Sequence, residues 1–156
     1  MITWLLGDYI TQIPTCKEVF LVLGKKLEYN IRKKAGEHMI IGIIGAGASG
    51  MAAALAASEN EKARVLLFER QARVGRKLLA TGNGKCNLTN MNAAPASYFG
   101  SRGVSRVLQA VSPARVRSYF QALGLLTKED DMGRVYPVNE QASAVLGCLL
   151  NACEEL

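Results

Sequence analysis

Residues 39–50 read MIIGIIGAGASG, an apolar run that leads directly into a glycine-rich turn. The run at 39–44 is almost continuously apolar, which is typical of a parallel strand buried on both faces. Gly45 permits a tight turn, Gly47 leaves room for a pyrophosphate because it has no Cβ, and Gly50 allows close packing of a helix on the strand. The stretch therefore predicts the start of a dinucleotide-binding βαβ unit.

The residues downstream complete this unit. Residues 48–58 are mostly alanine and predict a helix whose N-terminal N–H groups and partial positive charge favour phosphates. Residues 64–69 (RVLLFE) predict the second strand, and Glu69 follows Gly50 by 19 residues (69 − 50), close to the spacing of about 20 expected of a ribose-binding acid. A carboxylate there repels a 2′-phosphate, so FAD or NAD is favoured over NADP. The alternatives are glycine turns in an ordinary α/β domain and a solvated strand end at Glu69.

A second glycine-rich segment follows this acidic residue. It reads TGNGKCN at residues 81–87. The stretch 70–85 contains no acid and carries five positive charges, from Arg70, Arg73, Arg76, Lys77 and Lys85. A basic, glycine-rich loop of this kind can contact the far phosphates or the flavin end of a long cofactor. From the residues alone, a solvated basic loop is an equally good interpretation.

Residues 41–90 resemble the N-terminal signature of bacterial FAD-dependent oxidoreductases, of the aminoacetone-oxidase-like or 3-dehydro-bile-acid Δ4,6-reductase-like kind. The resemblance is carried by GAGASG at 45–50, ER at 69–70, GRKLL at 75–79, TGNGKCNLTN at 81–90, GRVYPV at 133–138 and AS at 142–143. It extends over about residues 39–156. It implies an α/β fold with a Rossmann-type FAD-binding βαβ unit, an incomplete parallel sheet, and a helical and hairpin insertion.

The resemblance also implies FAD as the bound dinucleotide and hydride transfer through the flavin as the chemistry. By this match the cofactor-binding residues are Gly45, Ala46, Gly47, Ala48, Ser49, Gly50, Glu69, Arg70, Lys77, Gly82, Gly84, Lys85, Cys86 and Asn87. Arginine is commoner than lysine at position 85 in the family, and lysine lacks the planar fork that binds a phosphate through two hydrogen bonds. Next to the flavin, Cys86 is either a redox thiol or a small buried side chain.

The sequence identifies no catalytic acid or base. The resemblance leaves the substrate open between a steroid- or bile-acid-like enone and a small amine, with NAD(P)H as a candidate electron donor of the full-length protein. Two other functions stay open. One is an NAD-binding Rossmann domain without flavin, and the other is an inactive, truncated product that at most binds nucleotide.

Residues 1–38 match no motif, and Met39 stands where a protein of this family would begin. We expect 1–38 to be a disordered extension or the result of a mis-assigned start, and 39–156 to be the N-terminal part of a truncated FAD-binding domain. The family's later motifs, which complete the sheet and the substrate domain, do not occur in the sequence. We therefore expect a marginally stable fragment, inactive alone, with poor cover over Ile43, Val65 and Leu67.

Composition limits the classes of partner. The net charge is +6, but only 6% of residues are aromatic and they do not alternate with basic residues, so we expect no nucleic acid as partner. No apolar stretch is long enough to span a membrane, so we expect a cytoplasmic protein with a small-molecule substrate. The four cysteines, at 16, 86, 148 and 153, show no metal-ligand spacing and suit reduced thiols. Nothing indicates the oligomeric state.

Three further elements are predicted beyond the second loop. Ser112-Pro113 is a helix N-cap followed by a first-turn proline, and Gly124 suits the end of that helix. Residues 125–127 and 134–136 flank a turn and predict a β-hairpin. Residues 140–156 predict a last helix, whose inward face is formed by Val145, Leu149 and Ala152.

Overall fold

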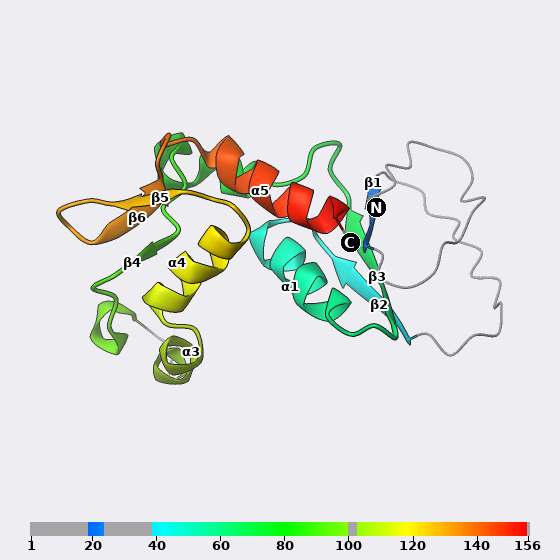
Figure 1. Cartoon of the computed structure of the whole chain (residues 1–156), viewed down its shortest axis with the longest axis horizontal. Helices are drawn as coiled ribbons and strands as arrows, with labels where there is room; N and C mark the ends of the chain where they lie inside the picture. Colours follow the sequence, from blue (N-terminus) through cyan, green and yellow to red (C-terminus); the bar gives the residue numbers. More distant parts are fainter. Residues whose placement is uncertain (1–18, 24–38, 100–102, 156) are drawn as a thin grey trace. The chain divides into compact units, whose positions relative to one another are not determined.

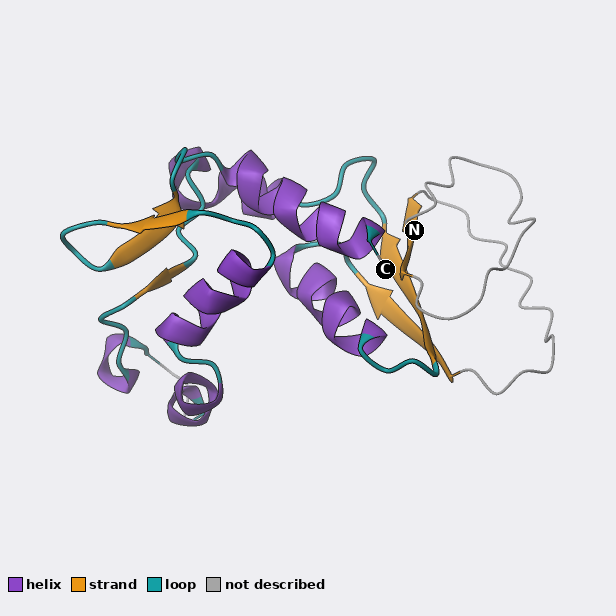
Figure 2. Cartoon of the chain, in the orientation of Figure 1, coloured by secondary structure: helices purple, strands orange, loops and turns teal. Residues whose placement is uncertain are grey.

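A computed structural model describes residues 19–23, 39–99 and 103–155, which fall into two compact units. Unit 1 comprises the described residues up to Arg76 together with those from Leu149 onward. Unit 2 is Lys77–Cys148. Figures 1 and 2 follow the chain through both units.

Unit 1 is built on a three-stranded parallel sheet with the strand order β1-β3-β2. Its strands are β1 (Val19–Leu23), β2 (Met39–Ile44) and β3 (Ala63–Glu69). The connection from β2 to β3 is the helix α1 (Ala48–Ser58), which packs along these two strands (Figure 1). The predicted strand–turn–helix–strand unit is confirmed, and the predicted bounds of its helix are those observed.

The strand β2 is more exposed than its apolar sequence predicts. Met39 and Ile40 are exposed, and Ile44 at the carboxyl end of the strand is 92% exposed. Within the described sheet β2 pairs on one edge only, with β3, from Met39 opposite Ala63 to Ile44 opposite Phe68. The prediction that 39–44 is buried on both faces is therefore wrong, because burial depends on neighbouring elements as well as on the strand's own residues.

The central strand β3 is better covered than expected. Val65 and Leu67 are fully buried, because β1 and β2 pair with the two edges of β3 and α1 packs on it. The expectation of poor cover is wrong for these two residues, while Ile43 is half-buried. The strand β1 lies within residues 1–38, which we expect to be a disordered extension or the result of a mis-assigned start, and the structure pairs it with β3. The rest of that segment, 1–18 and 24–38, lies outside the described residues.

Unit 2 holds a three-stranded antiparallel sheet with the order β4-β6-β5. Its strands are β4 (Thr89–Asn90), β5 (Thr127–Glu129) and β6 (Arg134–Pro137). The predicted hairpin is thus confirmed as β5–β6, but its first strand begins at Thr127, the residue at which the predicted strand ends. The helix α4 (Pro113–Ala122) begins after the predicted cap, where the Ser112 hydroxyl accepts a hydrogen bond from the N–H of Arg115 at 3.3 Å.

Four short helical segments lie among the described residues between β3 and α4. They are α2 (Arg76–Ala80), the 3₁₀ turns η1 (Thr81–Gly84) and η2 (Pro95–Ser97), and α3 (Val104–Ala110). Neither α2 nor α3 is predicted above, because each is too short to show a helical period. In the described part of the chain, no helix combines the length and the apolar character needed to cross a membrane.

The predicted last helix is confirmed as α5 (Ala142–Glu154). Val145 and Leu149 are buried as predicted, but Cys153 is fully buried in place of the half-buried Ala152. Burial raises the pKa of the Cys153 thiol to about 11. Because the thiolate is the reactive form, Cys153 is a packing residue.

Candidate nucleotide-binding site

The three glycines of the turn between β2 and α1 have different structural roles. Gly45 has a φ of +96° and donates its N–H to the carbonyl oxygen of Phe68 at 2.6 Å. A Cβ at Gly50 would lie 1.8 Å from the carbonyl oxygen of Gly45, so the helix and the turn meet without room for any side chain. A Cβ at Gly47 would have no atom within 4 Å. Gly45 and Gly50 therefore build the turn, and Gly47 leaves open space beside it.

The N-terminus of α1 suits an anion. Its N-cap residue is Gly47, no side chain caps the helix, and its first turn contains no acidic residue. The first backbone hydrogen bond of the helix runs from the N–H of Met51 to the carbonyl oxygen of Gly47, at 3.0 Å. The preceding N–H groups and the helix dipole attract negative charge. Open space at Gly47 and an uncapped helix end are the features that a bound pyrophosphate needs, so these residues fit a dinucleotide.

Glu69, predicted to bind the ribose, also holds the glycine turn in place. Its Oε2 accepts a hydrogen bond from the N–H of Ala46 at 3.0 Å, and its Oε1 accepts one from the N–H of Gln71 at 2.8 Å. The carbonyl oxygen of Ala46 accepts from the N–H of Gly75 at 3.1 Å, and Ala46 is 0% exposed. Both backbone groups of Ala46 are therefore fixed by residues at or beyond the end of β3. The sequence does not reveal this second role of Glu69, because the spacing of Glu69 from the glycines predicts only a contact with the ribose.

In unit 2, residues 81–87 form a compact loop with an unusual backbone. The φ angles of Gly82, Asn83, Gly84 and Cys86 are +54°, +54°, +83° and +56°. Two hydrogen bonds close the loop, both at 3.0 Å. The N–H of Lys85 donates to the carbonyl oxygen of Gly82, and the N–H of Cys86 donates to the carbonyl oxygen of Thr81. A Cβ at Gly82 would lie 2.8 Å from the backbone nitrogen of Asn87. Cys86 is buried, whereas the other predicted contacts in the loop are exposed.

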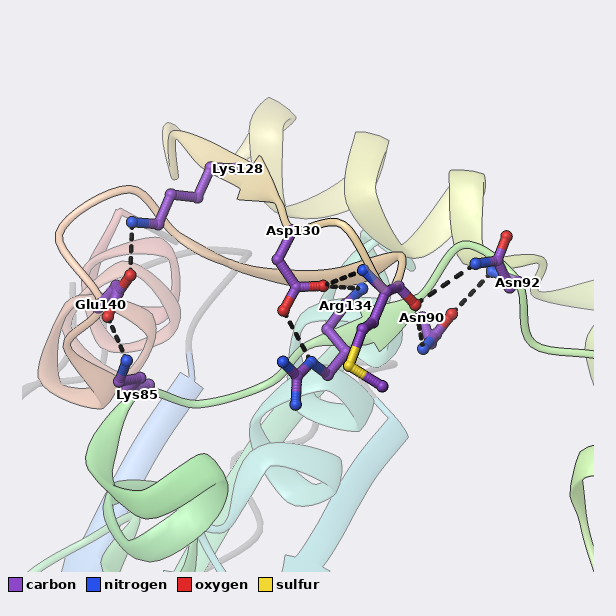
Figure 3. A network of polar contacts seen from close by, with 8 residues as sticks. Lys85, Asn90, Asn92, Lys128, Asp130, Arg134 and Glu140 are labelled. Carbon is purple, nitrogen blue, oxygen red and sulfur yellow. Dashed lines mark hydrogen bonds and ion pairs between the residues drawn. The ribbon is translucent and has the colours of Figure 1, made fainter.

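Two segments that carry the family resemblance, TGNGKCNLTN at 81–90 and GRVYPV at 133–138, are paired directly in unit 2. The N–H of Leu88 donates to Val135 at 2.8 Å, and β4 pairs with β6 through Thr89 opposite Val135. At Gly133 the φ is +77°, and an added Cβ would lie 2.5 Å from the side-chain amide nitrogen of Asn92, so another residue there would strain the backbone and displace Asn92. Figure 3 shows Asn90 and Asn92 beside the turn that leads into Arg134. The second segment therefore supports the strand that follows the loop.

A carboxylate that the sequence analysis did not identify contacts the loop. Glu140 Oε2 pairs with Lys85 Nζ at 2.5 Å, and Glu140 Oε1 pairs with Lys128 Nζ on β5 at 2.6 Å (Figure 3). Hydrogen bonds from Lys128 and then from Lys85 lower the pKa of Glu140 to about 2, and the bond to Glu140 raises the pKa of Lys85. No local pattern predicts these pairs, because Glu140 lies 55 residues beyond Lys85 in the sequence (140 − 85).

Replacing Lys128 with Met should raise the pKa of Glu140 from about 2 toward its ordinary value of 4.5, since the larger of its two hydrogen bonds is lost. The wild-type pKa is depressed by folding. The interaction therefore contributes fully above pH 4.5 and is lost as the pH falls toward about 2. Carbon-detected NMR of the Glu140 carboxyl group measures both values. The control is Arg117→Met, which removes a positive charge that pairs with Glu129 instead. An ordinary pKa in the wild type would contradict the prediction.

The predicted cofactor residues divide between the two units. Unit 1 contains residues 45–50, Glu69 and Arg70, and unit 2 contains Lys77, Gly82 and residues 84–87. Arg70 and Lys77 are exposed side chains. Among the described residues, no group of histidine, cysteine, aspartate and glutamate side chains is arranged to hold a metal ion.

Comparison with known proteins gives the family. Residues 39–156 match the family described as HI0933-like protein Rossmann domain. Over 112 residues, 70% of this chain and 27% of the relative, the chain is 42% identical to the 3-dehydro-bile acid delta(4,6)-reductase of Clostridium scindens. It is 30% identical to the ribosomal RNA dihydrouridine synthases of Escherichia coli over 119 residues and of Haemophilus influenzae over 115, in each case 72% of this chain and 28% of the relative. The chain thus spans little more than a quarter of the length of these curated relatives. By its match over residues 39–156 it belongs to the HI0933-like family, through that family's Rossmann domain.

Proposed function

We propose that this chain is the FAD-binding part of a flavin-dependent oxidoreductase. The observation that carries the proposal is the uncapped N-terminus of α1 next to the open space at Gly47, with Glu69 at the end of the neighbouring strand. Membership of the HI0933-like family supports FAD over NAD, because the sequence motifs of this chain resemble those of FAD-dependent oxidoreductases. When bound, FAD supplies hydride transfer.

The residues of this chain bind and orient the cofactor. The first-turn N–H groups of α1 donate to the pyrophosphate, whose approach is permitted by Gly47. The Glu69 oxygens each accept one backbone N–H and keep acceptor capacity for ribose hydroxyls. By the family resemblance, Gly82 and residues 84–87 are the proposed contacts to the remainder of FAD. No proton donor or acceptor for the substrate is assigned to any described residue.

For the substrate we propose an unsaturated ketone of steroid or bile-acid type, with NAD(P)H as the reductant and the cytoplasm as the location. This choice rests on the 42% identity to a protein named as a bile-acid delta(4,6)-reductase. Uracil in RNA is the second candidate, favoured by two relatives named as ribosomal RNA dihydrouridine synthases, each 30% identical. Both names describe saturation of a carbon–carbon double bond, so the two candidates share one chemistry and differ in substrate.

The test of the proposal is FAD binding by the whole chain, followed by quenching of flavin fluorescence. We expect saturable binding that ADP competes with, because α1 and Glu69 are proposed to hold the adenosine half of the cofactor. FMN, which lacks that half, should compete poorly. Tighter binding of NAD than of FAD would contradict the flavin assignment and support a Rossmann domain without flavin. Tight binding of RNA by the same sample would favour the second substrate.

A further inference from the structure

The residues with an unusual backbone gather around the second loop. Among the described residues, the non-glycine residues with positive φ are Asn83 (+54°), Cys86 (+56°) and Glu140 (+52°). Two of them lie in the loop at 81–87, and the third supplies the carboxylate that binds Lys85 of the same loop. Residues other than glycine rarely adopt a positive φ, and they keep it only where the surrounding structure imposes it. Both the loop and the residue that contacts it therefore contain backbone conformations that residues with side chains rarely adopt.

Glu140 itself is fixed to the sheet of unit 2. Its N–H donates to the carbonyl oxygen of Pro137 at 2.9 Å, at the end of β6. One carboxylate oxygen receives Lys128, whose backbone on β5 pairs opposite Tyr136 of β6. The other oxygen receives Lys85, which lies between Gly84 and Cys86. The carboxylate thus joins the glycine-containing loop to a paired hairpin (Figure 3).

We propose that Glu140 is a positioning residue for the loop at 81–87, and that Lys85 serves as the loop's anchor to Glu140. The Lys85 ammonium, held by Glu140, then does not act as the loop's principal phosphate contact. The part of the proposal that concerns the ligand rests on the proposed FAD site. The part that concerns the loop's shape does not depend on it.

The first test measures the loop without any cofactor. In Glu140→Gln the side chain keeps its size and the backbone requirement at position 140 is unchanged, so the variant removes the charge and replaces one of the two lysine-binding oxygens by an amide NH2 group. Hydrogen exchange of the Lys85 and Cys86 amides, which close the loop, should become about two- to fivefold faster, the range expected for loss of exposed ion pairs. Lys128→Met, which leaves the Lys85 pair intact, should have a smaller effect. Amides of α1 serve as the reference and should not change.

The second test measures FAD affinity in a double-mutant cycle of Lys85→Met and Glu140→Gln. If Lys85 acts through Glu140, the double variant binds FAD as weakly as either single variant and no weaker. If Lys85 is itself the phosphate ligand, Lys85→Met weakens binding well beyond Glu140→Gln, and that result would overturn the proposal. Unchanged exchange in Glu140→Gln would also overturn it. If the wild type fails to bind FAD, the proposed function fails, and the exchange data still decide whether Glu140 positions the loop.

Discussion

Gly50→Ala should unfold the glycine turn and abolish FAD binding, whereas Gly47→Ala should weaken FAD binding and leave the fold intact. The Cβ added at Gly50 would lie 1.8 Å from the carbonyl oxygen of Gly45 and 3.0 Å from its carbonyl carbon. Both are backbone atoms, so the clash is relieved only by moving α1 away from the turn. Overpacking in a well-packed region typically destabilises by 1–3 kcal/mol, and we expect this backbone clash to cost at least about 3 kcal/mol. A thermal melt followed by circular dichroism measures the loss.

The added methyl group at Gly47 meets no atom of the described protein within 4 Å, so the thermal transition should not move. The same open space is where the pyrophosphate is proposed to lie. A methyl group there should weaken FAD binding about 10- to 100-fold, or roughly 1.4–2.8 kcal/mol. Gly147→Ala in α5 is the matched control, because its Cβ would also have nothing within 4 Å. It should leave binding unchanged and stabilise the helix by about 0.5–1 kcal/mol. Unweakened FAD binding by Gly47→Ala would contradict the proposed position of the pyrophosphate.

The βαβ unit is predictable because its signals are local. An apolar run, three glycines at fixed spacing and an alanine-rich segment determine β2 and α1 without reference to distant residues. The exposure of Ile44 is not predictable in this way, because it depends on which strand pairs with β2. The same limit applies to Val65, whose burial comes from the pairing of β1 and from α1.

Some residues of the candidate site can likewise be found from local sequence patterns, and others cannot. The glycines and Glu69 are found from spacing, since ribose and pyrophosphate recognition needs those residue types at those intervals. Glu140 is found only in the folded chain, because its partners Lys85 and Lys128 come from separate segments. Its positive φ also has no sequence signal, since only glycine marks that conformation in a sequence. The second role of Glu69, as acceptor for the turn, likewise needs the end of β3 to be placed beside Ala46.

These two roles of Glu69 lead to a prediction with two separate readouts. Glu69→Ala removes the acceptor of the Ala46 N–H, and Ala46 is 0% exposed, so water can reach this donor only through the space that the half-buried Glu69 side chain vacates. An unsatisfied buried donor costs about 1–3 kcal/mol, and we expect a loss of about 2–3 kcal/mol in the free energy of unfolding. The Gln71 N–H is half-buried and should add little, because it can be rehydrated. In Glu69→Gln the amide oxygen can still accept from Ala46, so a smaller loss of about 1–2 kcal/mol is expected.

Whether Glu69 binds the ribose is measured by the ratio of the affinities for two ligands. A change in stability alone would not alter this ratio. The chain is titrated with ADP and with ADP that carries a 2′-phosphate. The wild-type carboxylate should accept the ribose hydroxyl of ADP and repel the 2′-phosphate. Glu69→Gln removes the charge and should shift the ratio toward the 2′-phosphorylated ligand by about tenfold, or roughly 1.4 kcal/mol. Glu61→Ala, in the exposed turn before β3, is the matched control and should change neither stability nor ratio. A lower stability with an unchanged ratio would mean that Glu69 holds the glycine turn and does not face the ribose, and the adenosine half would then have to bind elsewhere.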